Sequence, residues 1–210
     1  MKRFFSLLFA CLLLFVSSAH ASASFMHTDG TRVLDANGDL LVLRSISISS
    51  EQTPENEVYR DIASLGFHSV RLHFNYDQLE TDANPYQYLE AGLTWLDSHL
   101  AFAQKNGIGV ILNLHVPQGG FQSWGKGDAL WTDPENASRL TALWVMLATR
   151  YRDNPTVLGY SLLNEPCPVA IEQQAAYATW QTLATSVCSA VRAVDPNHTL
   201  VVEPVGMWTE

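Results

Sequence analysis

Short apolar segments alternate with longer amphipathic segments along most of this chain, and this alternation restricts the fold more than any other feature. The apolar segments are typical of strands that are covered on both faces. The longer segments repeat apolar residues at spacings of three and four, which indicates helices. Strands joined by helices run parallel through right-handed crossovers. The sequence therefore predicts an α/β fold around a parallel sheet.

The alternation predicts a small opening hairpin, five strands and four helical connections. The hairpin is expected over residues 31–43, around the turn Asn37-Gly38, and its second arm is expected to continue as the first strand to about Ser47. The later strands are expected at 67–74, 108–114, 157–163 and 199–203. The helices are expected from Thr53 to Gly66, from Leu89 to Gly107, from Asp133 to Tyr151 and over 170–193.

The N-terminal segment has the pattern of a secretory signal peptide. Lys2 and Arg3 are basic, residues 4–16 are almost entirely apolar, and small or polar residues follow to Ala23. The apolar stretch is short for a membrane span. We therefore expect a signal peptide over 1–23 and an exported, soluble mature chain from residue 24, either extracellular or periplasmic.

Two architectures fit the alternation, an open doubly wound sheet and a closed (β/α)8 TIM barrel. A glycine-rich turn after the first strand is absent from the sequence, which disfavours the dinucleotide-binding version of the open sheet. A barrel usually needs about 250 residues, whereas the whole chain has 210. We therefore expect one partial barrel domain over 24–210, truncated after about strand five.

Charge and composition exclude several classes of function. The formal charge is −9, with 12 basic and 21 acidic residues, and an acidic surface repels the phosphates of nucleic acids. The histidines are scattered, so neither a metal site nor another cofactor is expected. Cys167 and Cys188 remain in the mature chain, either as a disulfide or as two separate thiols.

Polar residues follow the predicted strands at the ends where parallel barrels carry their active sites. They are Arg71, His73, Asn75 and Tyr76 near the end of the second strand, Asn113 and His115 at the end of the third, Asn164 and Glu165 at the end of the fourth, and Glu203 at the end of the fifth. A buried polar group without a partner costs about 1–3 kcal/mol, so polar groups at four strand ends indicate a site. Glu165 stands out, because Pro166 ends the strand directly after it.

Four blocks, at residues 66–72, 112–120, 158–166 and 195–203, resemble in this order the conserved strands of glycoside hydrolase family 5, the cellulase family. The block 158–166, which ends in Asn164-Glu165-Pro166, resembles the signature of that family's fourth strand. Residues 66–72, 112–120 and 195–203 resemble its second strand, its third strand and the approach to its fifth. Ser161 and Asn113 depart from the usual pattern, which has an acid or amide at the first position and commonly Asp at the second.

The resemblance implies a retaining mechanism with two carboxylates about 5–5.5 Å apart. It implies that Glu165 is the general acid/base, that Asn164 binds the sugar 2-hydroxyl and that His115 binds other sugar hydroxyls. It also implies that Arg71 lies under the nucleophile, which is expected on strand seven, beyond residue 210. Glu203 is a weaker candidate for the nucleophile, and a loop, cap or subsite role is favoured for it.

Three further side chains are candidates for contact with the sugar. Tyr76 is a candidate subsite residue at the end of the second strand. Trp124 and Trp208 are expected in strand-end loops, where an indole face can stack on a sugar ring. Trp131 is expected in a similar loop, and for each tryptophan packing on its own barrel is the alternative.

The leading hypothesis is a secreted retaining glycosidase that cleaves β-linked glucan-type polysaccharide, with an endo-β-1,4-glucanase favoured. A β-mannanase or a β-1,3-glucosidase of the same family is the near alternative. A catalytically incomplete sugar-binding fragment is the alternative from another class of protein. The expected partner is a β-glycan polysaccharide or oligosaccharide, and the full-length protein is expected to be a monomer.

Overall fold

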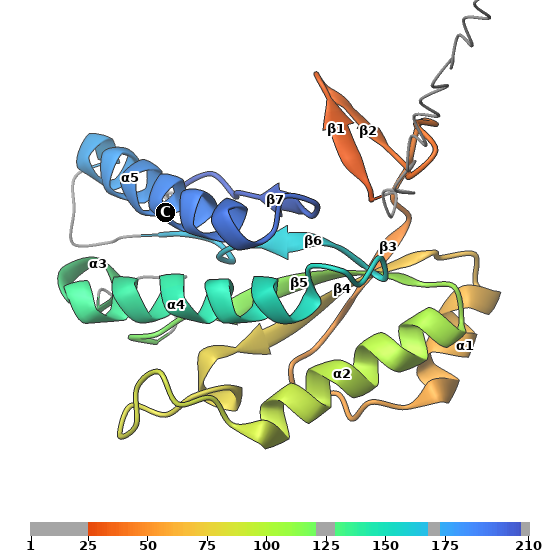
Figure 1. Ribbon diagram of the computed structural model, residues 1–210, viewed down its shortest axis with the longest axis horizontal. Helices are drawn as coiled ribbons and strands as arrows, with labels where there is room; N and C mark the ends of the chain where they lie inside the picture. Colours follow the sequence, from red (N-terminus) through yellow and green to blue (C-terminus); the bar gives the residue numbers. More distant parts are fainter. Residues whose placement is uncertain (1–24, 121–128, 168–172, 207–210) are drawn as a thin grey trace, which may run out of the picture.

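A five-stranded parallel sheet forms the centre of the molecule (Figure 1). The structure, a computed structural model, describes residues 25–120, 129–167 and 173–206. The strands follow one another across the sheet in chain order. They are β3 (Ser45–Ile48), β4 (Ser69–Asn75), β5 (Gly109–Val116), β6 (Val157–Ser161) and β7 (Thr199–Val201). Because this order never reverses, the sheet is that of consecutive β/α units in part of a (β/α)8 barrel, and the predicted fold class is confirmed.

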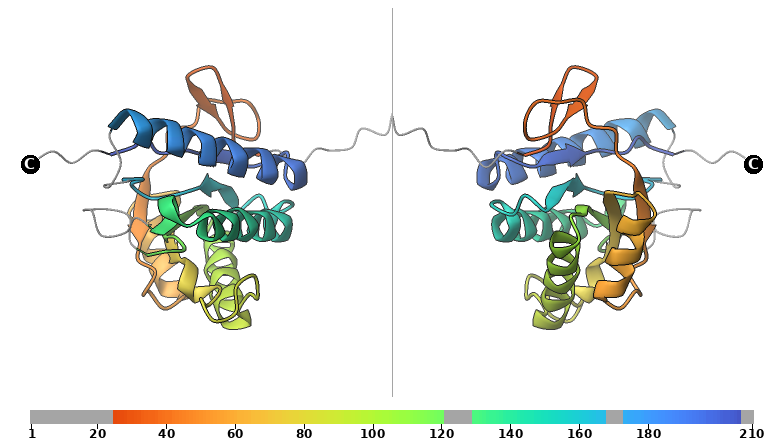
Figure 2. Two further views of the ribbon diagram at one scale, coloured as in Figure 1. Left: turned by 90° about the vertical axis from the view of Figure 1, so that its left-hand side faces the viewer. Right: turned by 90° about the vertical axis from the view of Figure 1, so that its right-hand side faces the viewer.

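Helices connect the strands and cover one side of the sheet. They are α1 (Asn56–Ser64), α2 (Glu90–Lys105), α4 (Pro134–Tyr151) and α5 (Gln173–Val194), with the short α3 (Ala129–Thr132) and the 3-10 turn η1 (Tyr76–Gln78). Helix α1 lies beside α2 and α4 lies beside α5 (Figure 2). Among the described helices, none is long and apolar enough to cross a membrane.

The helix boundaries match local sequence signals closely. Gly66 and Gly107 follow α1 and α2 with φ angles of 83° and 69°, a left-handed conformation that glycine adopts without steric cost. The Asp133 side chain accepts the backbone N–H of Glu135 at 3.0 Å and so caps α4. Helix α1 begins only at Asn56, three residues after Thr53. The glycines after α1 and α2 determine where the following strands, β4 and β5, begin.

The opening hairpin differs from the prediction. Its strands are β1 (His27–Asp29) and β2 (Arg32–Leu34), and the predicted second arm at residues 40–43 is reduced to one bridge between Leu34 and Leu40. The cause is Asp35, whose carboxylate accepts the backbone N–H groups of Asn37 at 2.8 Å and Asp39 at 3.0 Å. This local turn competes with a continued ladder. The strand prediction at 40–43 was therefore wrong.

Alternating residues along the strands face opposite sides of the sheet. Leu72, Phe74, Leu112, Leu114 and Tyr160 are fully buried within the hydrophobic core. Trp144 of α4 is buried among them, and its indole Nε1 donates to the carbonyl of Leu162 at 2.9 Å. The intervening residues face the interior of the barrel, and this alternation is what brings polar side chains together there.

A buried polar cluster fixes the loop between α5 and β7 near the amino ends of the strands. His198 Nδ1 lies 2.6 Å from a carboxylate oxygen of Asp195, and His198 Nε2 lies 3.1 Å from the carbonyl oxygen of Asn154. The Tyr160 hydroxyl donates to Asp195 at 2.8 Å. Burial opposes ionisation of Asp195, but the hydrogen bonds from Tyr160, Asn197 and His198 outweigh it and lower the pKa of that carboxyl group. The cluster therefore anchors β7.

A second buried cluster fixes two loops near the carboxyl ends of the strands. Arg139 of α4 contacts Glu80 at 3.2 Å and Asp82 at 2.9 Å. Gln118, in the loop after β5, donates to Glu80 at 2.6 Å. The side chains of Arg139 and Glu80 are 6% and 1% exposed. Because water scarcely reaches this ion pair, each charged group is stabilised by its partner and not by hydration.

Arg139→Met should therefore destabilise the protein strongly. The change leaves Glu80 buried without its cation, which costs about 3–5 kcal/mol in comparable buried pairs. Arg150→Met is the matched control, since the ion pair between Arg150 and Asp97 lies at the surface with 37% and 41% of the side chains exposed. Surface pairs contribute about 0–1 kcal/mol. Urea unfolding followed by circular dichroism measures both, and equal losses would contradict the assignment.

Candidate active site

Polar side chains converge at the carboxyl ends of β4 to β7, around the guanidinium of Arg71. One nitrogen of that group, Nη2, lies 2.6 Å from Asn113 Oδ1, 3.2 Å from Asn164 Oδ1 and 3.5 Å from Ser161 Oγ. The same nitrogen forms an ion pair with a carboxylate oxygen of Glu203. The Arg71 guanidinium, which can only donate hydrogen bonds, thus contacts oxygen atoms from three neighbouring strand ends.

Strand register explains why these groups meet. His73, Asn113, Ser161 and Val201 are direct partners across neighbouring strands, from β4 to β7. Arg71 lies two residues before His73, so its side chain faces the same side of the sheet. One face of four parallel strands thus delivers a row of polar side chains to one edge.

The Glu203 carboxylate is bound on both of its oxygens. Its Oε1 faces Arg71 and also lies 3.4 Å from Ser161 Oγ. Its Oε2 accepts the backbone N–H of Glu165 at 3.0 Å. The side chain is 24% exposed. Glu203 therefore lies between the arginine and the backbone that carries Glu165.

Glu165 has an unusual backbone conformation for a residue with a side chain. Its φ is 45°, in the left-handed region, and such residues cost about 1–3 kcal/mol unless their surroundings hold them. The preceding N–H, of Asn164, donates to the carbonyl of Leu114 at 2.9 Å. Pro166 directly after it accepts the N–H of Gly206 at 3.0 Å. The backbone groups of Asn164 and Pro166, on either side of Glu165, are thus both hydrogen-bonded, and this fixes the direction of the Glu165 side chain.

Two histidines stack beside these carboxylates. The rings of His73 and His115 are parallel within 9°, with centroids 4.4 Å apart. Burial, together with the electrostatic effects of His115 and Arg71, lowers the pKa of His73 to about 4. Burial and Arg71 also lower the pKa of His115, whereas the nearby carboxylates of Glu165 and Glu203 act in the opposite direction. Both imidazoles are therefore neutral near pH 7.

The structure brings together most of the side chains predicted for the site. Arg71 contacts both Asn164 and Glu203, and the backbone N–H of Glu165 donates to Glu203. His115 lies close enough to Arg71, Glu165 and Glu203 to feel their charges. Tyr76 instead belongs to the loop cluster, where its hydroxyl donates to Asp82 at 3.0 Å. Trp124 and Trp208 lie outside the described residues.

Two aromatic contacts were not anticipated from the sequence. Trp131 lies in the short helix α3, within the connection between β5 and α4, and it packs edge-on against Trp180 with centroids 6.0 Å apart. Trp180 of α5 also donates its indole N–H to the carbonyl of Glu203 at 2.8 Å. Helical spacing indicates burial of an indole ring but carries no information about the partner of its N–H.

The described residues hold no group of three or more His, Cys, Asp or Glu side chains that could bind a metal ion. Cys167 and Cys188 are both free thiols, which answers the open question of their pairing.

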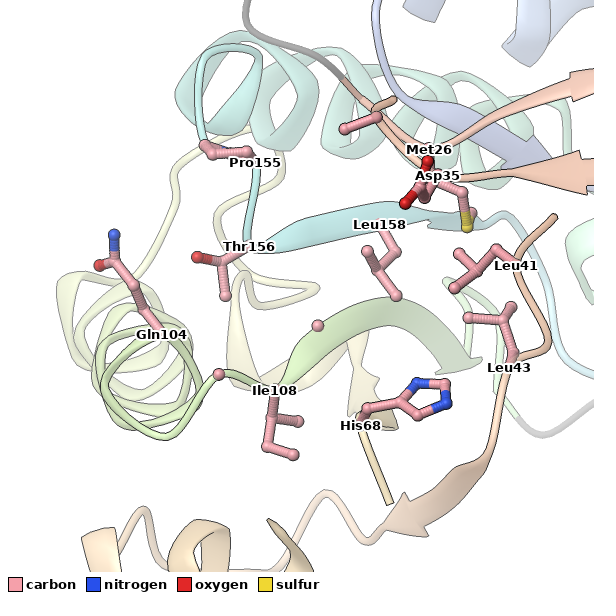
Figure 3. A pocket seen from close by; sticks show the side chains of 13 residues that line it. Met26, Asp35, Leu41, Leu43, His68, Gln104, Ile108, Pro155, Thr156 and Leu158 are labelled. Carbon is pink, nitrogen blue, oxygen red and sulfur yellow. The ribbon is translucent and has the colours of Figure 1, made fainter. Parts of the chain in front are cut away.

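A cavity of about 490 Å³ lies at the opposite, amino end of the strands, beneath the opening hairpin (Figure 3). Its lining includes His68, Thr156 and Leu158 and none of the polar side chains around Arg71.

These features define part of a (β/α)8 barrel with a polar, carboxylate-bearing site at the carboxyl ends of its strands. A family model described as cellulase (glycosyl hydrolase family 5) matches residues 34–210. The chain therefore belongs to glycosyl hydrolase family 5.

Individual relatives agree with this membership. The chain is 34% identical over 146 residues to a β-xylosidase of Phanerodontia chrysosporium, covering 67% of this chain and 29% of that protein. It is 32% identical over 142 residues to endoglucanase C of Acetivibrio thermocellus, covering 67% and 39%. The catalytic domain of the major endoglucanase from Xanthomonas campestris pv. campestris superposes with a TM-score of 0.67 at 25% identity, covering 84% and 56%. The chain thus spans less than two thirds of the length of each.

The depressed pKa of His73 predicts a loss of stability in mild acid. The folded chain binds a proton on His73 only near pH 4, whereas the unfolded chain binds it near the ordinary value of 6.5. The contribution of neutral His73 is therefore complete above about pH 6.5 and is lost as the pH falls toward 4. His73→Asn should lose less stability than the wild type across this window.

Urea midpoints at pH 7.0 and pH 4.5 test this difference. His27→Asn is the control, because His27 is exposed in β1. Its pH dependence should follow that of the wild type. The assignment fails if His73→Asn and the wild type lose the same stability between the two pH values.

Proposed function

We propose that the protein containing this chain is a retaining β-glycan hydrolase in which Glu165 is the general acid/base. The observation that carries the proposal is the position of Glu165, at the carboxyl edge of the sheet beside Asn164, His115 and the Arg71–Glu203 pair. Membership in glycosyl hydrolase family 5 supports the same role. This edge is where barrel enzymes bind and convert their substrates.

The proposed reaction uses Glu165 twice. Its carboxylic acid donates a proton to the glycosidic oxygen as that bond breaks, and the resulting carboxylate later removes a proton from the attacking water. Because the backbone of Glu165 is held by hydrogen bonds on both sides, its side chain keeps one direction through both steps. Fixed placement of a proton donor lowers the barrier without further reorganisation.

The neighbouring groups are proposed to bind the sugar. Asn164 Oδ1 accepts a hydrogen bond from Arg71, which fixes the amide plane and leaves its NH2 group to face a sugar hydroxyl. We assign that contact to the 2-hydroxyl, where it strengthens in the transition state. A neutral His115 can both donate to and accept from hydroxyl groups, which suits an uncharged ligand.

Glu203 is not assigned the role of nucleophile. Both of its oxygens already accept hydrogen bonds, from Arg71 and Ser161 on one side and from the Glu165 N–H on the other. With Oε2 directed at the backbone N–H of Glu165, this carboxylate is turned toward the protein backbone. The proposal therefore keeps the nucleophile on the seventh strand of the complete barrel, as the family resemblance implies.

The proposed substrate is a β-1,4-linked glucan cleaved within the chain. Endoglucanases occur among both the sequence relatives and the similar solved structures. The β-xylosidase at 34% identity makes a comparison of substrates necessary. Residues 1–23 are proposed to export the protein as a signal peptide to the periplasm or the extracellular medium, where polysaccharide is available.

Glu165→Gln should abolish most turnover of natural glycans in the complete natural protein. The amide keeps the size and hydrogen bonding of the side chain but cannot donate the proton that the leaving oxygen needs, and general acid catalysis supplies about 10²–10⁴-fold. Release of reducing sugar from cellulose and β-glucan measures the loss. Binding of cellotetraose by calorimetry should persist.

Glu57→Gln provides a matched control, because Glu57 lies exposed on the outer helix α1. This variant should keep the wild-type rate. Near-normal turnover by Glu165→Gln would remove Glu165 from its role. Binding of glycans without hydrolysis by the wild type would instead support a sugar-binding protein.

A panel of cellulose, mannan, laminarin and xylan should show the highest kcat/KM on the β-1,4-glucan. Cleavage within the chain lowers the viscosity of soluble glucan well before much reducing sugar appears, because few cuts shorten long chains. A steady release of monosaccharide with little change in viscosity would contradict endo cleavage. A preference for mannan, laminarin or xylan would contradict the proposed substrate and leave the role of Glu165 intact.

A further inference from the structure

We propose that Glu203 is a positioning residue for Glu165, because its carboxylate joins the backbone of that residue to the guanidinium of Arg71. This inference rests on the proposed function of Glu165, since Glu203 is argued to act through it. Glu203 comes 38 residues after Glu165 in the chain. The contact is therefore made by the tertiary fold and not by local sequence.

The first part of the argument is the hydrogen bond to a left-handed residue. Glu165 has a φ of 45°, a conformation that residues with a side chain seldom adopt without support. Its N–H points at Glu203 Oε2, 3.0 Å away. A carboxylate is a strong acceptor for a backbone N–H. Removal of this acceptor frees the peptide of Glu165 to rotate, and the direction of its side chain then changes.

The second part is that Glu203 itself is immobilised. Its other oxygen, Oε1, is held by Arg71 and lies 3.4 Å from Ser161 Oγ. Its backbone carbonyl accepts the indole N–H of Trp180 at 2.8 Å. Trp180 is 4% exposed and packs against Trp131. The carboxylate is therefore fixed from both the barrel interior and helix α5.

The third part is charge. Arg71 lies 3.2 Å from Asn164, the residue directly before Glu165. Histidines His73 and His115, which also face this region, have lowered pKa values and are neutral near pH 7. Glu203 forms an ion pair with Arg71. It compensates the guanidinium charge beside the backbone N–H of Glu165.

Hydrogen exchange at the Glu165 amide tests the contact directly and does not require activity. In Glu203→Ala this amide should exchange about tenfold or more faster than in the wild type. Glu203→Gln should give an intermediate rate, because its amide oxygen can still accept. The amide of Asn164, which donates to Leu114, should remain protected in all variants. Unchanged exchange at Glu165, or equal acceleration at Asn164 and Glu165, would overturn the proposal.

Kinetics on two leaving groups separate positioning of the acid from a general loss of structure. Natural glycans need a proton on the departing oxygen. In a 2,4-dinitrophenyl β-cellobioside, the leaving group is 2,4-dinitrophenolate, which departs without one. In the complete natural protein, Glu203→Ala should lower kcat/KM on cello-oligosaccharides at least about tenfold more than on the aryl glycoside. Glu57→Gln should change neither value. Equal losses on both substrates would overturn the proposal.

The two tests also distinguish this inference from the proposed function. A wild-type protein that hydrolyses no glycan contradicts the proposed function, and the amide exchange still decides whether Glu203 holds Glu165. An active wild type with an inactive Glu165→Gln variant and a fully active Glu203→Ala variant supports the function and contradicts the positioning role.

Discussion

The guanidinium of Arg71 joins the carboxyl ends of four neighbouring strands, and the arrangement of the site depends on it. A half-buried guanidinium needs oxygen atoms around it to replace the water that solvates it at the surface. Asn113 of β5, Ser161 and Asn164 of the β6 end and Glu203 after β7 supply them. Each of these side chains is held in place by its contact with the same guanidinium. The polar site is therefore rigid before any ligand binds.

The sequence predicts the order of elements because the signals that place them are local. Gly66, Gly107 and Asp133 act within one helical turn, and their conformations and hydrogen bonds agree with the expectation. The parallel sheet follows from the alternation of strands and helices. The second arm of the hairpin failed because the Asp35 side chain satisfies two backbone N–H groups, a competition that hydrophobic alternation does not reveal.

The sequence predicts which residues belong to the candidate site, but it does not predict which of them contact one another. Strand ends identify Arg71, His115, Asn164 and Glu165, since parallel strands end at one edge. The place of Glu203 between Arg71 and Glu165 depends on contacts between segments that are far apart in the chain. Tyr76 was grouped with the site by position, yet its hydroxyl bonds to Asp82 and its ring lies beneath Arg139. Such choices follow from packing between distant segments.

A rigid site has a free-energy cost, because it needs a left-handed backbone conformation at Glu165 and several half-buried charges. Away from Glu165, buried clusters hold the framework on which these groups depend. Asp195 and His198 anchor the start of β7 in a fully buried pair, and β7 leads directly to Glu203. Arg139 and Glu80 fix the loops beside the same edge. A fold that secures both ends of its strands can maintain strain at one residue, and this is the condition under which Glu165 keeps a single direction.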